Sequence, residues 1–150
     1  MRRFLVLATC LFLCVAMLPS HASRSTVAEP NAASADGLAE HMEGLKTNLK
    51  GVAMALQGPD AETALRHLAE MQRIVLLAKL ESPPNLDEQP ESERHAHRQE
   101  FRKSLVRVLQ ELAGMELEIL DGDYEAAFAR VTGPLYTLRE SSHDKFQRAE

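Results

Sequence analysis

The sequence predicts an all-α protein that forms a single antiparallel, up-down-up-down four-helix bundle. Four segments repeat their apolar residues at alternating spacings of four and three, which places one apolar stripe along one face of each helix. No segment alternates apolar and polar residues in the manner of a strand, and two of the links are short, which favours antiparallel neighbours. The 150 residues, 5% of them aromatic and none of them Trp, fit one domain.

The N-terminus has the pattern of a cleaved secretory signal. Residues 1–3 are Met followed by two arginines, residues 4–18 are almost entirely apolar, and Ser20 and Ala22 form a small-x-small pattern. The apolar run is shorter than the ~20 residues that a membrane-spanning helix needs. We therefore expect cleavage after Ala22 and export to the periplasm, and the alternative is an uncleaved membrane anchor.

The exported chain is expected to contain no cysteine, because Cys10 and Cys14 both lie inside the signal. No disulfide and no thiolate ligand is then available. Residues 23–35 are rich in Ser, Ala and Asn without an apolar period, so we expect a flexible leader before a domain over residues 36–150. The formal net charge of −5 argues against a broad nucleic-acid surface.

The first helix is predicted from about Gly37 to Leu56, with Ser34 or Asp36 as its N-cap. The turn over residues 57–60 ends this helix, and Asp60 is expected to cap the next one. The stripe consists of Leu38, Met42, Leu45, Leu49, Val52 and Leu56.

The second helix is predicted over about residues 61–80. It stops at Ser82-Pro83-Pro84, because the residue before a proline is biased away from helix. Residues 74–77, Ile-Val-Leu-Leu, are apolar nearly all round, which predicts deeper burial at this end of the helix. The stripe consists of Leu65, Leu68, Met71, Val75 and Ala78.

The third helix is expected to begin between Pro90 and His97 and to end at residues 121–123, where Gly122 suits a left-handed conformation and Asp123 caps the next helix. The fourth is predicted over about residues 124–148, with a kink or break at Pro134 because proline cannot donate to the preceding turn. The two stripes consist of Phe101, Leu105, Val108, Leu112, Met115 and Ile119, and of Phe128, Val131, Leu135 and Leu138.

Motifs of the common enzyme classes are missing from the sequence, which contains no phosphate-binding loop and no HExxH, CxxC or GxSxG. We therefore do not expect an enzyme. Five histidines follow the signal. His95 and His97 lie in a charged run and are predicted to be solvated, with a weak adventitious metal site as the alternative. His41 and His67 lie beside the stripes of their helices.

Met42 and His143 are the candidate metal ligands. In the predicted topology the start of the first helix and the end of the fourth lie at the same end of the bundle, and at ~1.5 Å per residue both side chains lie ~8–9 Å from that end. An imidazole and a thioether facing each other are a ligand pair of haem iron. The alternatives are a methionine that merely fills the core and an exposed histidine near the terminus.

The same end of the bundle is expected to gather an apolar lining, with Pro83 and Pro84 at its lip. The lining would come from the end of the second helix, the start of the third and the last turns of the fourth. Its residues are Ile74, Leu77, Leu80, Phe101, Leu105 and Phe146.

Four patches of the sequence resemble the soluble cytochrome b562 family. Residues 38–49, LAEHMEGLKTNL, resemble its first helix, and residues 82–86, SPPNL, resemble the double-proline loop after its second helix. Phe101-Arg102 resembles the start of its third helix, and residues 138–146, LRESSHDKF, resemble its C-terminal helix. The patches occur in the family's order with similar separations.

The resemblance implies a non-covalent haem b protein in which Met42 and His143 are the axial ligands and Arg139 lies at the haem edge. Covalent attachment is not expected, because the sequence has no CxxCH. Together with the apolar lining, the candidate haem-contacting residues are Leu45, Leu49, Leu77, Pro84, Phe101, Leu105, Arg139 and Phe146.

The function that follows is electron transfer in the periplasm, without a nucleic-acid or membrane partner after the signal is removed. An acidic surface would favour a redox partner protein with a basic patch. Two alternatives remain at this point. One is a haem-free four-helix bundle that serves as a binding or regulatory module, and the other is a protein that binds copper or another soft metal through Met and His.

Overall fold

The computed structural model describes residues 35–147, and all of its regular elements are helices. The described part contains no strand, so the predicted all-α class is confirmed. The expected signal (1–22) and all but the last residue of the expected leader (23–35) lie outside the described residues. The elements are α1 (Ala35–Gln57), α2 (Ala61–Ala78), the short 3-10 helix η1 (Leu86–Glu88), α3 (Glu91–Leu120), α4 (Tyr124–Thr132) and α5 (Pro134–Phe146).

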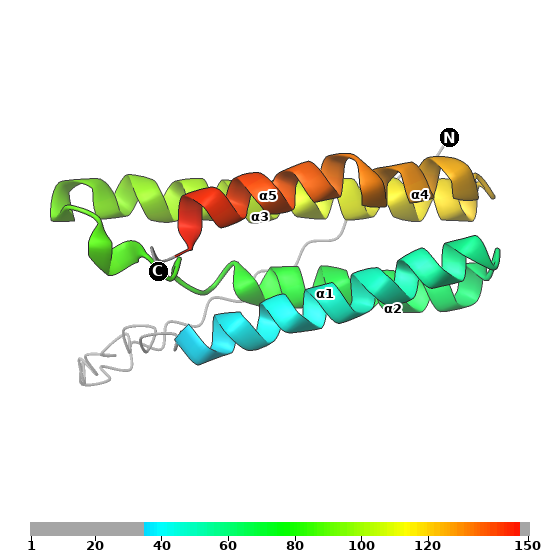
Figure 1. The fold of residues 1–150 in the computed structure, drawn as a ribbon, viewed down its shortest axis with the longest axis horizontal. Helices are drawn as coiled ribbons and strands as arrows, with labels where there is room; N and C mark the ends of the chain where they lie inside the picture. Colours follow the sequence, from blue (N-terminus) through cyan, green and yellow to red (C-terminus); the bar gives the residue numbers. More distant parts are fainter. Residues whose placement is uncertain (1–34, 148–150) are drawn as a thin grey trace, which may run out of the picture.

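The helices form two layers (Figure 1). α1 and α2 lie side by side in one layer, and α3 lies with α4 and α5 in the other. The α1–α2 and α3–α4 turns lie on the right of the view, whereas the start of α1 and the end of α5 both lie on the left. α2 packs against α3 and α1 packs against α4, so the two layers are joined along both sides.

Two aspartates cap helices at the turns, as the sequence predicts. The side chain of Asp60 accepts a hydrogen bond from the backbone N–H of Thr63 at 3.0 Å, and Asp123 accepts one from that of Ala126 at 3.0 Å. Gly122 has a φ of +80°, the left-handed conformation that glycine adopts at low cost. These bonds satisfy N–H groups that have no partner inside the helix.

The predicted break in the last helical segment occurs at Gly133 and Pro134. The N–H of Gly133 still donates to the carbonyl of Ala129 at 2.9 Å, and α5 then begins with Pro134. Proline has no N–H with which to continue the ladder, but it is well suited to the first turn of a helix. α4 and α5 therefore follow one another as separate helices.

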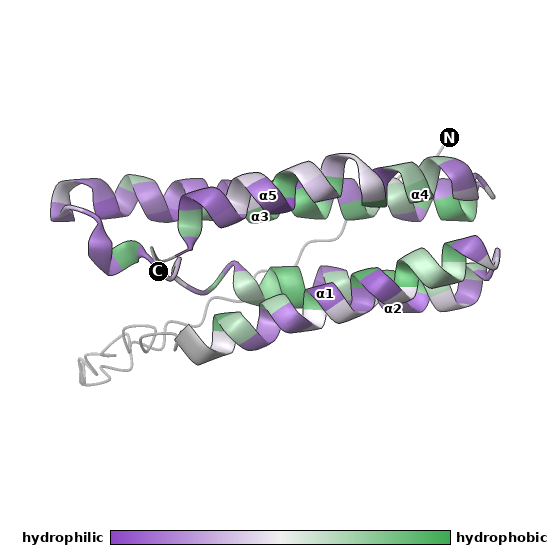
Figure 2. Cartoon of the chain, viewed as in Figure 1, coloured by the Kyte–Doolittle hydropathy of each residue, from purple (hydrophilic) through white to green (hydrophobic). Residues whose placement is uncertain are grey.

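The core forms where the apolar stripes of the helices meet. Figure 2 shows these stripes as green bands that recur along the helices between purple ones. The largest fully buried side chains come from three helices, and all of them lie on the predicted stripes. They are Val52, Leu68, Val75, Leu112, Met115 and Ile119.

The end of α2 is not buried all round, so this part of the sequence prediction is wrong. Ile74 and Val75 are 6% and 0% exposed, but Leu76 is 53% exposed and Leu80 is 72% exposed. Only the face of α2 that packs against α1 and α3 is covered. The chain leaves the helix after Ala78 toward η1, and within the described residues no segment covers the opposite face.

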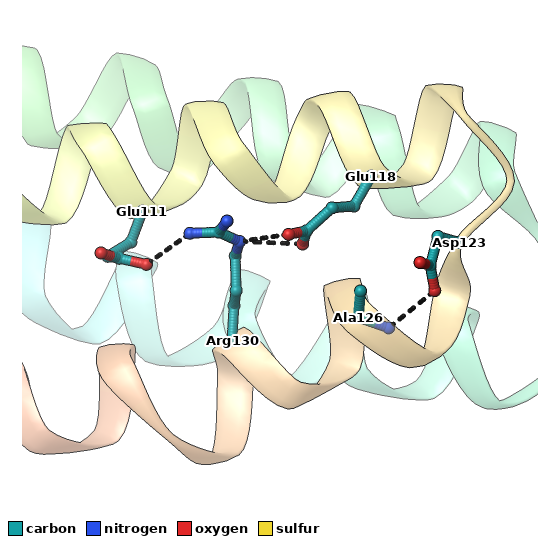
Figure 3. Close-up of polar contacts among 5 residues, drawn as sticks. All are labelled: Glu111, Glu118, Asp123, Ala126 and Arg130. Carbon is teal, nitrogen blue, oxygen red and sulfur yellow. Dashed lines mark hydrogen bonds and ion pairs between the residues drawn. The ribbon is translucent and has the colours of Figure 1, made fainter.

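Polar contacts join the helices away from the predicted haem end. Arg130 of α4 lies between two carboxylates of α3 (Figure 3), with Nε 2.8 Å from Glu118 and Nη1 2.7 Å from Glu111. Its guanidinium lies over Gly114, where a Cβ would come within 2.7 Å of Cζ. The hydrogen bond that Arg130 donates to the Glu118 carboxylate raises the pKa of Arg130 above its usual value and outweighs the opposing effect of burial.

A second polar pair joins α1 to α2. The imidazole Nδ1 of His67 lies 2.9 Å from Oδ1 of Asn48, and the Asn48 amide donates to the carbonyl of Gly44 at 2.9 Å. The ring of His67 passes over Gly51, where a Cβ would lie 2.6 Å from ring atoms. His67 is therefore half-buried between two helices.

Candidate haem site

A cavity of about 860 Å³ opens between α1, α3 and α5. Its size falls within the range of small-molecule sites, and it is far larger than the voids of a packed core. The cavity forms because α1 packs against α4 but makes no comparable contact with α5 within the described residues. Its apolar wall is formed by Leu38, Leu45, Leu49, Met71, Phe101, Leu105, Val108, Val131, Leu135, Leu138 and Phe146.

Met42 and His143 both line this cavity. Met42 is half-buried on α1, and His143 is exposed in the last turn of α5. α1 and α5 lie in different layers of the bundle (Figure 1), so the two side chains belong to different walls. Neither the thioether nor the imidazole makes a hydrogen bond or ion pair with another described residue, so both keep their lone pairs available for a metal.

Most of the other predicted site residues also lie on the cavity wall. Leu77 does not: it is 39% exposed and absent from the lining. Leu77 lies on the face of α2 that points away from α1 and α3, which corrects its assignment, and Ile74 and Leu80 are likewise not part of the lining. The predicted residues that do line the cavity are Leu45, Leu49, Pro84, Phe101, Leu105, Arg139 and Phe146.

The contribution of α2 to the cavity comes instead from Met71, which is 3% exposed. Met71 was identified in the sequence only as part of the α2 stripe. Its position on this stripe is the signal that could have identified it as a cavity residue, because the stripe is the face of α2 that packs toward the other helices. The four consecutive apolar residues at 74–77 gave a stronger but misleading signal.

Cationic side chains predominate among the charged residues of the wall. Glu43 and Lys46 form an exposed ion pair of 3.2 Å, which leaves little net charge. Lys50 and Arg139 also line the cavity, and neither makes an ion pair within the described residues. An apolar cavity with unpaired cations on its wall suits a ligand that is largely apolar and carries carboxylates.

The family comparison agrees with this geometry. The sequence model of the family described as Cytochrome b562 matches residues 37–147, which is most of the chain. The chain belongs to the cytochrome b562 family. Proteins of this family bind haem b non-covalently through iron and transfer electrons, and they are not typical enzymes. A comparison with curated protein sequences finds no match.

The size and lining of the cavity fit haem b. A flat, aromatic ligand would meet apolar walls in the cavity, together with an imidazole, a thioether and two cations that have no hydrogen-bond or ion-pair partner among residues 35–147. Within residues 35–147 no group of three or more His, Cys, Asp or Glu side chains is placed to hold a metal ion. None of the helices in that part of the chain combines the length and hydropathy of a membrane-spanning segment.

Sequence reasoning missed Asn85, a buried polar residue at the edge of the cavity. Asn85 is 6% exposed, and its amide Nδ2 donates to the backbone carbonyl of Lys145 at 3.0 Å. Its Oδ1 lies 2.7 Å from Nε2 of His97, so the imidazole donates to this oxygen. His97 is therefore partly buried and bonded, and the prediction that it is simply solvated is wrong.

Aromatic rings complete this junction. The ring of Phe146 lies edge-on to that of His97, with centroids 5.2 Å apart, and edge-on to that of Phe101, also at 5.2 Å. Such arrangements are favourable for aromatic pairs. Phe146 and Phe101 both line the cavity, so the junction connects its wall to the loop after α2. The last turn of α5, which carries His143, is thereby held against α3.

Proposed function

We propose that this protein is a periplasmic one-electron carrier that holds haem b between Met42 and His143. The observation that supports this most directly is that the two side chains line one apolar cavity and have no partner among the described residues. Bound haem b supplies the one-electron iron couple. An imidazole and a thioether as the two axial ligands favour a raised potential.

The ligands also define the class of reaction. If Met42 and His143 both hold the iron, no substrate would need to bind it, and the protein would act by outer-sphere electron transfer. The apolar side chains of Leu45, Phe101 and Leu105 exclude water from the centre of the cavity. An apolar surrounding without water disfavours the additional positive charge of oxidised iron. It therefore raises the reduction potential, as the thioether does.

The charged residues of the wall orient the cofactor. Arg139 lies one turn before His143 on α5, and Lys50 lies two turns after Met42 on α1. We assign both to the haem carboxylates, because a carboxylate next to an unpaired guanidinium or ammonium forms a charge-assisted hydrogen bond. Ligands in the centre and cations at the edge would together fix which side of the ring enters the cavity.

The domain organisation belongs to the same proposal. A signal over residues 1–22 is removed on export, a leader over residues 23–35 follows, and residues 36–150 form the haem domain. Its helices have antiparallel, up-down-up-down order, with α4 and α5 together serving as the fourth helix. No membrane or nucleic-acid partner is part of this function.

A haem titration of the exported chain tests the proposal. Stoichiometric binding with a sharp low-spin visible spectrum is the expected result, and dithionite reduction should sharpen the bands further. Weak, high-spin or absent binding would contradict it and would leave a haem-free bundle that acts as a binding module. Metal affinity that is unaffected by haem would instead favour a soft-metal site at Met42 and His143.

A further inference from the structure

The outer face of α3 concentrates positive charge in an otherwise acidic protein. Between Arg94 and Arg107 the chain has five basic residues and one acidic residue, Glu100, although the formal net charge of the whole chain is −5. The cations follow helical spacing: Arg98 and Arg102 are four residues apart, as are Lys103 and Arg107. Like charges at this spacing destabilise an isolated helix, so the arrangement costs the fold stability.

Most of this charge is not neutralised within the protein. Glu100 lies 2.6 Å from Lys103 and 3.5 Å from Lys145, and it is the one acid within this stretch. Arg98, Arg102 and Arg107 are exposed and make no hydrogen bond or ion pair with another described residue. By contrast, Arg73 and Arg130 both lie within 3 Å of carboxylates of the protein itself.

The cations surround a shallow groove rather than projecting separately into solvent. The groove has a volume of about 480 Å³, and within it Val106 is 39% exposed. An apolar side chain surrounded by arginines is the composition of a protein-protein contact, in which Arg is enriched. The residues of the groove are Gln99, Arg102, Lys103, Val106, Arg107 and Gln110.

We propose that this face, defined by Arg98, Arg102, Lys103 and Arg107 and called here the α3 basic face, docks an acidic surface of a partner protein. A long polyanion such as nucleic acid would also meet the net negative charge of the rest of the molecule. A local acidic patch would meet only the nearby cations, because charges beyond a Debye length of about 8 Å are screened. A membrane-binding helix would present large apolar anchors on this face, and Val106 is the exposed apolar residue in the groove.

The position of the face relates it to the cavity. The opposite side of the same stretch of α3 supplies Phe101, Leu105 and Val108 to the cavity wall. A helix with its side chains is about 10 Å across, so a docked partner would lie about one helix thickness from the cofactor. Docking for electron transfer rests on the proposed function. An acidic partner is the opposite of the expectation from net charge, which favoured a partner with a basic patch.

Charge reversal tests the docking surface. The variant Arg98→Glu/Arg102→Glu/Arg107→Glu reverses three of the four charges of the α3 basic face. The control Arg66→Glu/Arg73→Glu/Lys79→Glu, on α2 and its C-cap, changes the net charge equally. A labelled poly-glutamate peptide serves as the acidic probe for the haem-loaded protein, with binding followed by fluorescence anisotropy. The affinity of the α3 variant for poly-glutamate should be at least about tenfold lower than that of the parent. The affinity of the control should fall by less than about threefold, and added salt should weaken the parent complex.

Three outcomes would overturn the proposal. These are no binding of poly-glutamate to the parent protein, an equal loss in the α3 and control variants, and a stronger α3-dependent affinity for phosphatidylglycerol vesicles or single-stranded DNA than for poly-glutamate. The visible spectrum is recorded for every variant. If the parent protein shows an intact low-spin spectrum but does not bind poly-glutamate, only the docking surface is refuted. If the parent shows no haem spectrum, the proposed function is refuted.

Discussion

The side-chain amide of Asn85 donates to the backbone carbonyl of Lys145 at 3.0 Å, and this bond joins the loop after α2 to the last turn of α5. Lys145 follows His143 by two residues. The position of the candidate ligand therefore depends on a loop that is 60 residues away in sequence. The same asparagine accepts from His97, so one buried side chain connects three segments at the edge of the cavity.

Asn85→Ala is predicted to destabilise the fold by about 1–3 kcal/mol, the cost of leaving buried hydrogen-bonding groups unsatisfied. It should also speed haem dissociation by about tenfold, because the turn that carries His143 loses its anchor. Urea unfolding measures the first effect, and haem transfer to apomyoglobin measures the second.

Asn48→Ala is the matched control for this experiment. Asn48 also bonds a histidine, His67, at 2.9 Å, but it lies between α1 and α2 and does not line the cavity. This variant should lose comparable stability while haem dissociation remains close to that of the parent. If both variants release haem equally fast, general destabilisation and not positioning of His143 accounts for the effect of Asn85→Ala.

Met42→Ala is predicted to leave the iron five-coordinate or water-ligated and to lower the reduction potential, because a thioether favours the reduced state. The visible spectrum and a redox titration measure these changes. Met54→Ala removes a methionine of the same helix that is 63% exposed, and it should change neither quantity. An unchanged low-spin spectrum in Met42→Ala would show that this thioether is not a ligand.

His143→Ala is predicted to weaken haem binding by more than about 100-fold, since the loss of an outer-shell partner alone can cost up to that factor. His41→Ala is the control, because His41 bonds the carbonyl of Gly37 and does not line the cavity. Its haem affinity should stay within about threefold of the parent. A comparable loss in both variants would refute the assignment of His143.

The helices were predictable from sequence because their stripes depend only on local periodicity. The caps at Asp60 and Asp123 and the break at Pro134 were predictable for the same reason, since each follows from the chemistry of one or two neighbouring residues. These features set where α2, α4 and α5 begin, and hence the order of helices and turns along the chain.

The sequence predictions are wrong where the burial of a residue depends on which segment covers a given face of a helix. The apolar run at residues 74–77 resembles a buried helix end, but only the neighbours of α2 determine that Leu77 faces solvent. Asn85 and His97 look like ordinary loop and surface residues in the sequence, because their bond joins positions 12 residues apart and their further partners, Lys145 and Phe146, lie at the end of α5. A single sequence carries no local signal for such a contact.

Asp60→Asn is predicted to reduce the acid sensitivity of the fold. The backbone hydrogen bond from Thr63 lowers the pKa of Asp60 below its ordinary value of 3.8. A carboxylate with a lowered folded-state pKa contributes stability that is present above the unfolded pKa and is lost as the pH falls through the folded pKa. Asparagine still caps the helix but does not titrate.

The measurement is the urea unfolding free energy of parent and Asp60→Asn as a function of pH. The two curves should run parallel above about pH 5 and converge toward each other below about pH 4, because only the parent loses a charged cap there. Other carboxylates titrate in both proteins and cancel in the difference. A constant difference from neutral pH down to about pH 2 would show that the charge of Asp60 adds nothing to the cap.

Haem binding is predicted to raise the thermal stability of the protein, because the cavity exists only in the folded state. At free haem about 100 times above its dissociation constant, linkage adds about 2.7 kcal/mol, which corresponds to roughly 10 °C in the melting temperature of a domain of this size. His143→Ala should lose most of this shift while its haem-free form melts close to the haem-free parent, since His143 is exposed and makes no side-chain bond to another described residue. Equal melting of the parent with and without excess haem would mean that the cavity does not bind haem in the folded state, whatever the family of the chain.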